Sequence, residues 1–302
     1  MTTTKPKRVV VAINPQASFG KSRAVGPAAV AALRSAGHEV ASLTEADFEQ
    51  LRHSAGSALA SNPDALVVVG GDGMVNLGVN LVADTTIPLG IVPSGTGNDV
   101  SRGLGIPIRN PDRAIQSLLA ALDAPPRIID AGFVTRSDGS TSWFAGVFSA
   151  GFDAIVNERA NQMRWPRGPQ RYNLALLREL AMLKPIHYRL TLDGESLETD
   201  AVLVAVANNV SLGGGMLITP EAKIDDGLLD VFVVQPLSRT AFLRIFPRVF
   251  KGTHVTDARV SIRRARRIRV DADNVVAYAD GERVAGLPLD VEVRPGALRV
   301  LA

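Results

Sequence analysis

The chain has 302 residues, of which 46% are hydrophobic and 21% are charged, and its formal net charge is +3. This length and composition exclude a disordered protein and leave room for two domains with real cores. The absence of cysteine excludes a disulfide framework, a Cys-ligated zinc site and a thiol nucleophile. No apolar run approaches the ~20 residues needed to span a bilayer. We therefore expect a cytoplasmic protein that is soluble or attaches peripherally to a membrane.

The basic residues are clustered rather than spread along the chain. Clusters of this kind, with only a mild net charge, suit a membrane surface or a phosphate ligand better than extended nucleic acid. We therefore expect no nucleic-acid partner. The clusters comprise Arg159, Arg164, Arg167 and Arg171, and then Arg263, Arg264, Arg266, Arg267 and Arg269.

The first 126 residues alternate strands with helices. This alternation predicts a three-layer α/β domain whose parallel sheet is covered on both faces and binds ligands at the carboxyl ends of its strands. Asn14, Asp72 and Thr96 fall at such ends. The expected strands are 8–13, 38–43, 66–69 and 88–93. One expected helix ends near residue 36, one runs from Thr44 through Leu59 to Asn62-Pro63, and one runs from Asn76 to Leu81.

From residue 127 onward the pattern changes to short β-rich runs separated by turn residues. It predicts an antiparallel β-sandwich domain over 127–302, and the final strands, 290–293 and 298–301, either stay in it or return to the first domain. Helices are expected at 157–183 and 238–250, and we expect the second to pack into the core with its basic residues in solvent. The other expected strands are 128–134, 142–149, 188–192, 201–207, 228–234, 260–262 and 268–270.

The turn Gly70-Gly-Asp-Gly73 interrupts an apolar strand. We expect its glycines to adopt positive φ and to let the backbone approach a ligand closely. A helix starting at Asn76 would point its first N–H groups at an anion. Asp72 would repel a phosphate unless a divalent metal intervenes, so it indicates metal-assisted phosphate chemistry. The alternative is a tight strand-to-helix turn in which Asp72 is a cap.

Three glycine-bearing loops follow strands, at 14–20, 70–73 and 93–99. The first is not a P-loop, because Pro15 stands where the leading glycine is needed, and the third lacks the last glycine of a dinucleotide fingerprint. What remains is a set of backbone donors with the short polar side chains of Asn14, Thr96 and Asn98. A nucleoside triphosphate fits these groups.

Seven motifs in order resemble the diacylglycerol kinase catalytic family, which includes bacterial lipid kinases and sphingosine kinases. The resemblance implies a two-domain lipid kinase that binds ATP between an α/β domain and a β-sandwich domain. The motifs are Asn14-Pro15, Gly70-Gly-Asp-Gly73, Pro93-Ser-Gly-Thr-Gly-Asn-Asp99, Gly151-Phe-Asp-Ala154, Gly213-Gly-Gly215, Asp225-Asp-Gly-Leu-Leu-Asp230 and Asp280-Gly-Glu282.

The same resemblance assigns roles by position. Asp226 would hold Mg²⁺ with the carbonyls of Lys223 and Leu228, and Glu282 would be the catalytic base, assisted by Asp280. The nucleotide contacts would be Asn14, Thr44, Gly70, Gly71, Asp72, Gly73, Met74, Asn76 and Thr96.

Residue types alone leave other interpretations open for three of these segments. Asp280-Gly-Glu282 is typical of a hairpin turn, and Asp225-Asp-Gly227 is also a turn signal. Thr44 is equally suited to be a helix N-cap with Asp47 at the capping-box position.

The chain departs from the family pattern at Met74, where threonine is usual, and at Leu77, where glutamate is usual. We predict an ATP- and Mg²⁺-dependent kinase of a membrane lipid, with diacylglycerol as the first candidate. The alternatives are an NAD kinase-like enzyme and a catalytically degenerate nucleotide- or lipid-binding protein. The aromatic and basic segment 163–172 would contact lipid headgroups or be a plain surface loop. The sequence leaves a homodimer open.

Overall fold

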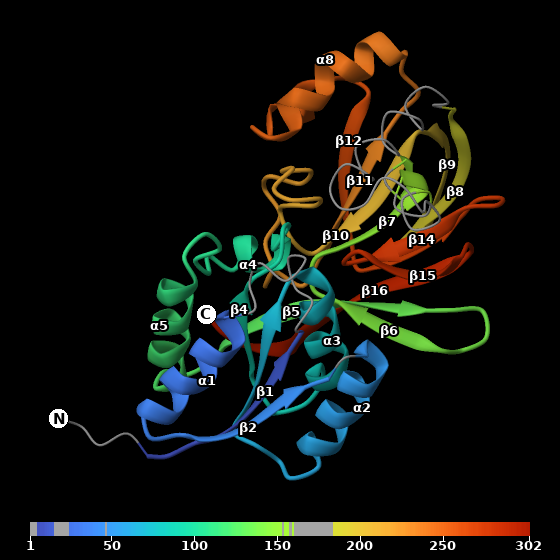
Figure 1. Ribbon diagram of the computed structural model, residues 1–302. Helices are drawn as coiled ribbons and strands as arrows, with labels where there is room; N and C mark the ends of the chain where they lie inside the picture. The colour runs from blue at the N-terminus through green and yellow to red at the C-terminus, as the bar shows by residue number, and fades with distance from the viewer. Residues whose placement is uncertain (1–4, 15–23, 46, 153, 157–158, 160–183) are drawn as a thin grey trace. The chain divides into compact units, whose positions relative to one another are not determined.

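A computed structural model gives the fold and describes residues 5–14, 24–45, 47–152, 154–156, 159 and 184–302 (Figure 1). The chain divides into two compact units. The first comprises Met1–Asp130 together with Gly296–Ala302, and the second comprises Ala131–Pro295. The end of the chain therefore belongs to the first unit.

The first unit is built on a parallel sheet with strand order β2-β1-β3-β4, and the end of β16 pairs parallel to β4. Helices α1 and α5 cover one face of this sheet and α2 and α3 cover the other (Figure 1). The predicted three-layer α/β domain is confirmed. Its elements are β1 Arg8–Ile13, α1 Val25–Ser35, β2 Glu39–Thr44, α2 Phe48–Leu59, β3 Ala65–Gly70, α3 Asp72–Val82, β4 Leu89–Pro93, α4 Asp99–Gly103 and α5 Pro111–Leu122.

The central strands of this sheet are apolar because they are covered on both faces, as parallel strands usually are. Every residue of β3 is buried. The register then brings the ends of the strands to one edge. Thr44 pairs with Ile13, Ile13 pairs with Val69, and Gly70 pairs with Pro93. Loops that follow these residues leave the sheet at the same edge.

The second unit contains antiparallel sheets that enclose a large apolar core, which confirms the predicted antiparallel β domain. One sheet has the order β12-β11-β10-β7-β14-β15, and the other pairs β16, β13, β8 and β9, with the β5–β6 hairpin joined to β16. The elements are β5 Arg127–Thr135, β6 Thr141–Phe144, β7 Val147–Gly151, β8 Ile186–Leu192, β9 Glu195–Ala201, β10 Leu203–Ala207, β11 Leu229–Val234, α8 Arg239–Val249, η2 Thr253–Thr256, β12 Val260–Ala265, β13 Arg267–Asp271, β14 Val276–Ala279, β15 Glu282–Gly286 and β16 Leu289–Leu301.

Two predicted helix starts were wrong. Helix α2 begins after Asp47, whose side chain accepts the backbone N–H groups of Glu49 and Gln50, so Asp47 is the N-cap. Thr44 is instead the last residue of β2. Helix α3 begins at Asp72, four residues before the predicted start, because Gly71 already serves as its N-cap.

Strand predictions failed in two ways: boundaries were misplaced within a long β-rich run, and strands with a weak apolar pattern were missed. The expected strand 142–149 is two strands, β6 and β7, and the two expected final strands are the single strand β16. Strands β9, β14 and β15 were not predicted. β9 lies at the edge of its sheet and is mostly exposed and half-buried, so its sequence carries little apolar pattern.

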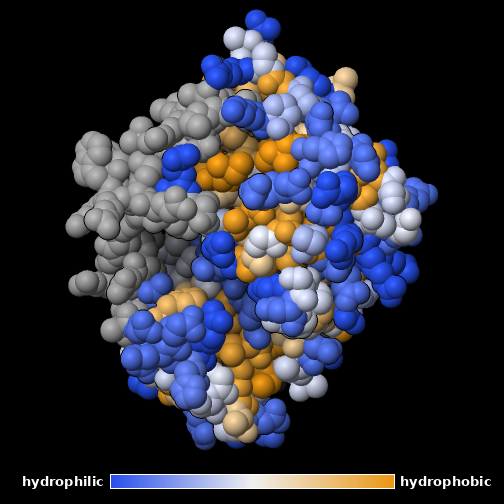
Figure 2. Space-filling view, turned by 90° about the vertical axis from the view of Figure 1, so that its right-hand side faces the viewer, coloured by the Kyte–Doolittle hydropathy of each residue, from blue (hydrophilic) through white to orange (hydrophobic). Residues whose placement is uncertain are grey.

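Some predictions fall outside the described residues. These are the helix at 157–183, of which the structure describes Arg159 alone. They also include the aromatic and basic segment 163–172 and positions 15–20 of the first loop. Among the described helices, none is both long and apolar enough to cross a membrane. Hydrophilic residues cover much of the face drawn in Figure 2, and hydrophobic residues reach that face in separate patches.

Candidate active site

Two glycine loops meet at the carboxyl ends of β3 and β4. The backbone N–H of Ser94 donates to the carbonyl of Gly70 at 2.8 Å. A Cβ atom on Gly95 would lie 2.3 Å from the Cα of Gly71, which is closer than real Cβ atoms approach other atoms. Glycine is therefore needed at this crossing for close packing of two backbones.

The expected positive φ angles in this region were wrong for the glycines. None of the glycines at 70–73 has a positive φ, and the residue in the left-handed region is Asn98, with φ of 52°. The side chain of Asn98 stabilises this conformation, because its Oδ1 accepts the N–H of Gly95 at 3.1 Å and its Nδ2 donates to the Gly95 carbonyl at 2.9 Å.

Asp72 links the two loops through both of its carboxylate oxygens. Oδ2 accepts the backbone N–H of Asn98 at 2.8 Å, and Oδ1 accepts that of Asp99 at 2.7 Å. Burial raises the pKa of Asp72 above its ordinary value, and the neighbouring carboxylate of Asp99 raises it further. In the described residues Asp72 acts as a cap, here for the helix that follows the other loop.

The two departures from the family pattern are core residues. Met74 and Leu77 are each 1% exposed in α3. The Met74 side chain packs directly against Gly70, where an added Cβ would lie 2.3 Å from its Cγ. A side chain in this position fills the core of the first unit instead of facing a phosphate.

The remaining predicted nucleotide contacts lie at the same edge of the first unit. Asn14 follows β1 and donates its backbone N–H to Val69 at 3.3 Å. Thr44 ends β2, Thr96 is exposed in the second glycine loop, and Asn76 is half-buried in α3. The fold thus places all of these positions in one unit, along consecutive strand ends and the first turns of α3.

The predicted base lies in a tight hairpin of the second unit. Asp280 and Gly281 have φ of 49° and 84° and connect β14 to β15, and Glu282 is the exposed first residue of β15. Two consecutive positive φ angles are typical of a type I′ turn. The hairpin expected from residue types is therefore present, and it presents the carboxylate of Glu282 to solvent.

Asp280 holds this hairpin against the turn between β6 and β7. Its Oδ2 accepts the N–H of Ala145 at 2.9 Å, and its Oδ1 accepts those of Gly146 at 2.9 Å and Val147 at 3.0 Å. Asp280 is 7% exposed. Its observed contacts fix the hairpin that carries Glu282 to the turn between β6 and β7.

The same turn occurs a second time in this unit. Asp193 and Gly194 have φ of 49° and 97°, and Glu195 is the exposed first residue of β9. Asp193 also accepts backbone N–H groups, from Arg266 and Arg267. An Asp-Gly-Glu hairpin is therefore a structural unit of this fold, and its sequence alone cannot identify a catalytic glutamate.

The predicted metal ligand Asp226 lies in a polar cluster next to Arg264. Asp226 Oδ1 accepts the N–H of Leu228 at 3.2 Å, and its Oδ2 is 4.0 Å from Nη1 of Arg264. Burial raises the pKa of the nearby Asp230, while Arg264, 3.5 Å away, acts in the opposite direction. The described residues contain no group of three or more acidic or histidine side chains arranged to hold a metal.

This donor set nevertheless fits Mg²⁺, which commonly takes one or two carboxylates and keeps several waters. The side chain of Asp226 is partly exposed, and only its Oδ1 takes part in the hydrogen bond from Leu228, so Oδ2 is a candidate ligand atom. The carbonyls of Lys223 and Leu228 belong to the same loop, and Lys223 is exposed.

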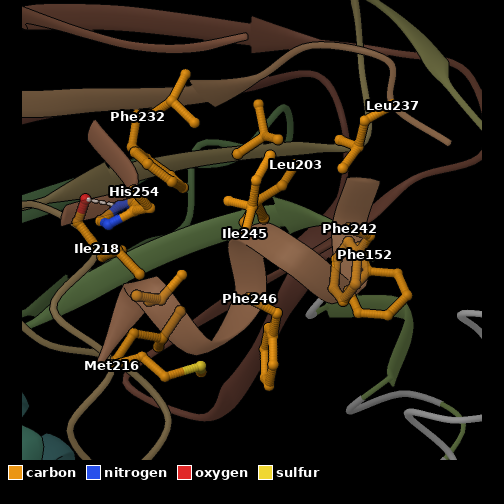
Figure 3. A pocket seen from close by; sticks show the side chains of 14 residues that line it. Phe152, Leu203, Met216, Ile218, Phe232, Leu237, Phe242, Ile245, Phe246 and His254 are labelled. Carbon is orange, nitrogen blue, oxygen red and sulfur yellow. Dashed lines mark hydrogen bonds between the residues drawn. The ribbon is translucent and has the colours of Figure 1, made fainter. Parts of the chain in front are cut away.

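An apolar pocket lies between α8 and the outer face of the β10–β11 sheet, all within the second unit (Figure 3). Its empty volume is about 680 Å³, open solvent at its mouth included. The lining residues are Phe152, Leu203, Leu212, Met216, Ile218, Phe232, Val234, Leu237, Phe242, Ile245, Phe246, Val249, His254 and Val260.

Four phenylalanines form a continuous row along this pocket and α8. The ring centroids are 5.1 Å apart for Phe152 and Phe242, 5.4 Å for Phe242 and Phe246, and 5.9 Å for Phe246 and Phe250. Phe152 and Phe242 lie close together at one side of the pocket in Figure 3. Rings in such contact provide an apolar surface of the kind that an alkyl chain can pack against.

His254 brings an imidazole to the lining of this apolar pocket. One ring nitrogen, Nε2, lies 3.1 Å from the carbonyl of Ile218, and the ring packs edge-on against Phe232 (Figure 3). A carbonyl oxygen only accepts, so Nε2 carries the proton. Burial lowers the pKa of His254 below its ordinary value of 6.5.

Comparisons with known proteins cover most of the chain and agree with one another. Residues 8–130 match the model of the diacylglycerol kinase catalytic domain, and residues 146–302 match that of the YegS C-terminal NAD kinase beta sandwich-like domain. A diacylglycerol kinase of Mycobacterium tuberculosis strain H37Rv is 41% identical over 97% of this chain and 94% of its own. The chain belongs to the diacylglycerol kinase family.

A more distant relative agrees with this family, and a solved structure shares the fold. A diacylglycerol kinase of Bacillus subtilis strain 168 is 26% identical over 84% of this chain and 82% of its own. The crystal structure of a diacylglycerol kinase from Bacillus anthracis strain Sterne has the same fold, with a TM-score of 0.72 and 23% identity over 99% and 97% of the two chains. Membership of this family implies the use of ATP and a lipid substrate.

Sequence reasoning missed the pocket of this kinase entirely. Its lining comes from β10, β11, α8, η2 and β12, from the loops before and after β11, and from Phe152, which follows β7. No short motif joins these parts of the chain. The spacing of phenylalanines at 242, 246 and 250 was a usable signal, because residues four apart share one face of a helix. The sequence pattern, however, predicts that this face packs into the core.

Proposed function

We propose that this kinase transfers the γ-phosphate of ATP to the free hydroxyl of diacylglycerol at a membrane surface. The observation that carries the proposal is the apolar pocket of the second unit, in a chain whose relative at 41% identity is a diacylglycerol kinase. The pocket suits the acyl chains of a lipid, because it is lined almost entirely by aliphatic and aromatic side chains.

The first unit would bind the phosphates of ATP. Its two glycine loops and the start of α3 lie at one edge of a parallel sheet, where backbone N–H groups and a helix N-terminus favour anions. Asp72 and Asn98 would keep these loops in place through the hydrogen bonds described above. Phosphoryl transfer depends chiefly on such positioning and on neutralising charge.

Glu282 would be the general base that accepts the proton of the lipid hydroxyl. It is exposed and stands at the first position of β15, on a hairpin fixed by the three hydrogen bonds to Asp280. A positioned carboxylate typically contributes about 10²–10⁴ to such a rate. Asp280 would act on catalysis through the position of Glu282.

Asp226, with the carbonyls of Lys223 and Leu228, would hold Mg²⁺ directly or through water. The ion would offset the negative charge of the triphosphate. Arg264, whose guanidinium is 4.0 Å from Asp226, would keep this carboxylate oriented.

The substrate is tested by incubating the enzyme with γ-labelled ATP and a total lipid extract and identifying the labelled product. Phosphatidic acid is the expected product. Label transferred to NAD and not to lipid would favour the soluble-substrate alternative. Binding of ATP without any transfer would favour the degenerate binding protein suggested by Met74 and Leu77.

The base is tested with Glu282→Gln and with Glu195→Gln as a matched control, because the second glutamate occupies the same place in an identical Asp-Gly-Glu hairpin. The first variant should lose roughly 10²-fold or more in kcat, with ATP affinity and thermal stability unchanged. The control should keep wild-type kcat. Equal activity of Glu282→Gln and Glu195→Gln would remove the base assignment and leave the substrate proposal standing.

The metal site is tested with Asp226→Asn and a titration of activity with Mg²⁺. The variant should need at least about tenfold more Mg²⁺ for half-maximal activity, because it loses a charged ligand. Asp225→Asn is the matched control, since Asp225 is the exposed neighbour. An unchanged Mg²⁺ requirement in Asp226→Asn would place the ion elsewhere.

A further inference from the structure

Helix α8 exposes large apolar side chains. Leu243 is 58% exposed and Phe250, directly after the helix, is 51% exposed. In the part of the chain that the structure describes, Ile128 is the single other large hydrophobic residue with such exposure. The expectation that this helix packs into the core with its basic residues in solvent was therefore wrong for Leu243 and Phe250.

Leu243 and Phe250 lie on one side of the helix, because seven residues make almost two full turns. Phe250 keeps helical backbone angles, so it continues this face. A basic residue follows each of them directly, Arg244 after Leu243 and Lys251 after Phe250. The outer side of α8 thus carries two apolar and basic pairs, which we call the outer α8 face: Leu243, Arg244, Phe250 and Lys251.

The chain around this face is uniformly basic. Residues 235–256 contain no aspartate or glutamate, and they contain Arg239, Arg244, Arg248 and Lys251. Arg248 is engaged in the fold, because its guanidinium donates to the Thr253 carbonyl and to Thr256 Oγ1. The side chains of Arg239, Arg244 and Lys251 are exposed, and no described ion pair involves them. This charge complements an anionic surface.

The inner side of the same helix lines the apolar pocket. Phe242, Ile245 and Phe246 point into it (Figure 3). Phe246 also contacts the ring of exposed Phe250. One row of phenylalanine rings therefore runs from the pocket to the outer α8 face.

We propose that the outer α8 face docks on the anionic surface of a bilayer and brings the mouth of the pocket to the lipid. This inference rests on the proposed function, since it assumes that the substrate is a bilayer lipid. Helices that lie in the membrane interface combine Phe and Leu with Lys and Arg in this way. A second copy of the chain fits less well, because a two-fold interface would bring the same basic residues together.

The experiment measures sedimentation of the purified enzyme with vesicles of phosphatidylcholine alone or mixed with phosphatidylglycerol. Wild type should bind the mixed vesicles more tightly, and salt should weaken this binding. The variant R244Q/K251Q should bind the mixed vesicles roughly 30-fold more weakly. L243S/F250S should lose roughly 10- to 100-fold for both vesicle types, because it removes apolar area that enters the interface.

Matched controls are I128S, which removes the other large exposed hydrophobic side chain of the described residues, and R263Q/R266Q, which removes two exposed cations from β12 and the turn that follows it. Both should bind vesicles like wild type. Unchanged vesicle binding by both α8 variants would overturn the proposal. So would a wild-type dimer that L243S/F250S converts to a monomer, because the face would then be a self-association surface.

Activity separates the docking proposal from the proposed function. R244Q/K251Q, which leaves the phenylalanine row intact, should phosphorylate diacylglycerol in mixed vesicles more slowly than wild type and should keep wild-type kcat on a short-chain diacylglycerol supplied as monomers. Equal slowing on monomers would show damage to catalysis and overturn the docking role. If no form of the enzyme phosphorylates diacylglycerol, the proposed function fails while vesicle binding still reports on α8.

Discussion

Asp72 Oδ2 accepts the backbone N–H of Asn98 at 2.8 Å, although the two residues are 26 positions apart and belong to different glycine loops. The second oxygen of Asp72 accepts the next N–H, that of Asp99. One carboxylate therefore sets the distance between two loops that we propose to bind the same nucleotide. The pKa of Asp72 is raised by its burial, so this placement has a cost that the two hydrogen bonds offset.

Asp72→Asn should raise KM for ATP by about tenfold and destabilise the fold by about 1–2 kcal/mol. The amide keeps one acceptor oxygen but turns an NH₂ group toward a backbone N–H, which leaves that donor unpaired. Part of this loss is regained because a neutral side chain avoids the cost of burying a charge. Urea denaturation and steady-state kinetics at varied ATP measure the two effects.

The matched control is Asp112→Asn, which also changes an aspartate in the first turn of a helix, but an exposed one. It should lose no more than about 0.3–1 kcal/mol, the usual contribution of a charge near a helix N-terminus, with unchanged KM. A KM for ATP that stays at the wild-type value in Asp72→Asn would show that this link does not shape the nucleotide site.

Gly95→Ala should reduce ATP affinity by at least about tenfold, because the added Cβ would meet the Cα of Gly71 at 2.3 Å and force the loops apart. Gly56→Ala is the control within the same unit. Its Cβ would meet only the end of Leu81 at 3.6 Å, and alanine favours the helix by about 0.5–1 kcal/mol. Calorimetric titration with ATP measures both, and similar affinities in the two variants would contradict the prediction.

The sequence predicted the fold well where a physical pattern was local. Buried strands such as β3 are continuous apolar runs, and these were found. Glycine roles were harder to predict, because Gly71 and Gly95 are required by contact between two distant loops and not by their own φ angles. Asp72 was assigned to a metal or to a local cap, but its partners lie 26 and 27 residues away.

The candidate site could be predicted only in part for the same reason. The hairpin of Asp280 and Glu282 resembles that of Asp193 and Glu195, so no local signal distinguishes a base from a turn residue. The apolar pocket depends on how α8 packs on a sheet, and helix periodicity does not specify which of two apolar sides faces inward. The prediction that this helix packs into the core therefore failed for Leu243, which is exposed.

Asp280→Asn should destabilise the fold by about 1–3 kcal/mol, because it leaves a buried backbone N–H without its acceptor. Asparagine tolerates the left-handed conformation at this position, so backbone strain contributes little. Asp193→Asn is the matched control in the second hairpin, where the aspartate is exposed, and it should lose less than about 1 kcal/mol. Thermal unfolding of the two variants measures the difference.

The same pair distinguishes a positioning role from a purely structural one. Asp280→Asn should also lower kcat at temperatures where it remains folded, since Glu282 follows two residues later, whereas Asp193→Asn should not. An Asp280→Asn enzyme with lowered stability and full kcat would mean that the hairpin tolerates the change without moving Glu282.

His254→Gln should remove part of the acid sensitivity of the fold. The pKa of His254 is lowered by burial from its ordinary value of 6.5, so below that pH the unfolded chain takes up a proton that the folded chain resists. The stability linked to His254 is therefore fully present above pH 6.5 and is lost as the pH falls. The free energy of unfolding falls by at most about 1.4 kcal/mol by pH 5.5. This is the linkage of one proton over the one pH unit below 6.5. Urea denaturation at pH values of about 7.5 and 5.5 should show a smaller drop in the free energy of unfolding for the variant than for wild type, by up to this amount.

The control is His53→Gln, which replaces an exposed histidine in α2 and should keep the wild-type drop in the free energy of unfolding. An equal drop in wild type and His254→Gln would mean that the imidazole takes up its proton as easily in the folded pocket as in the unfolded chain.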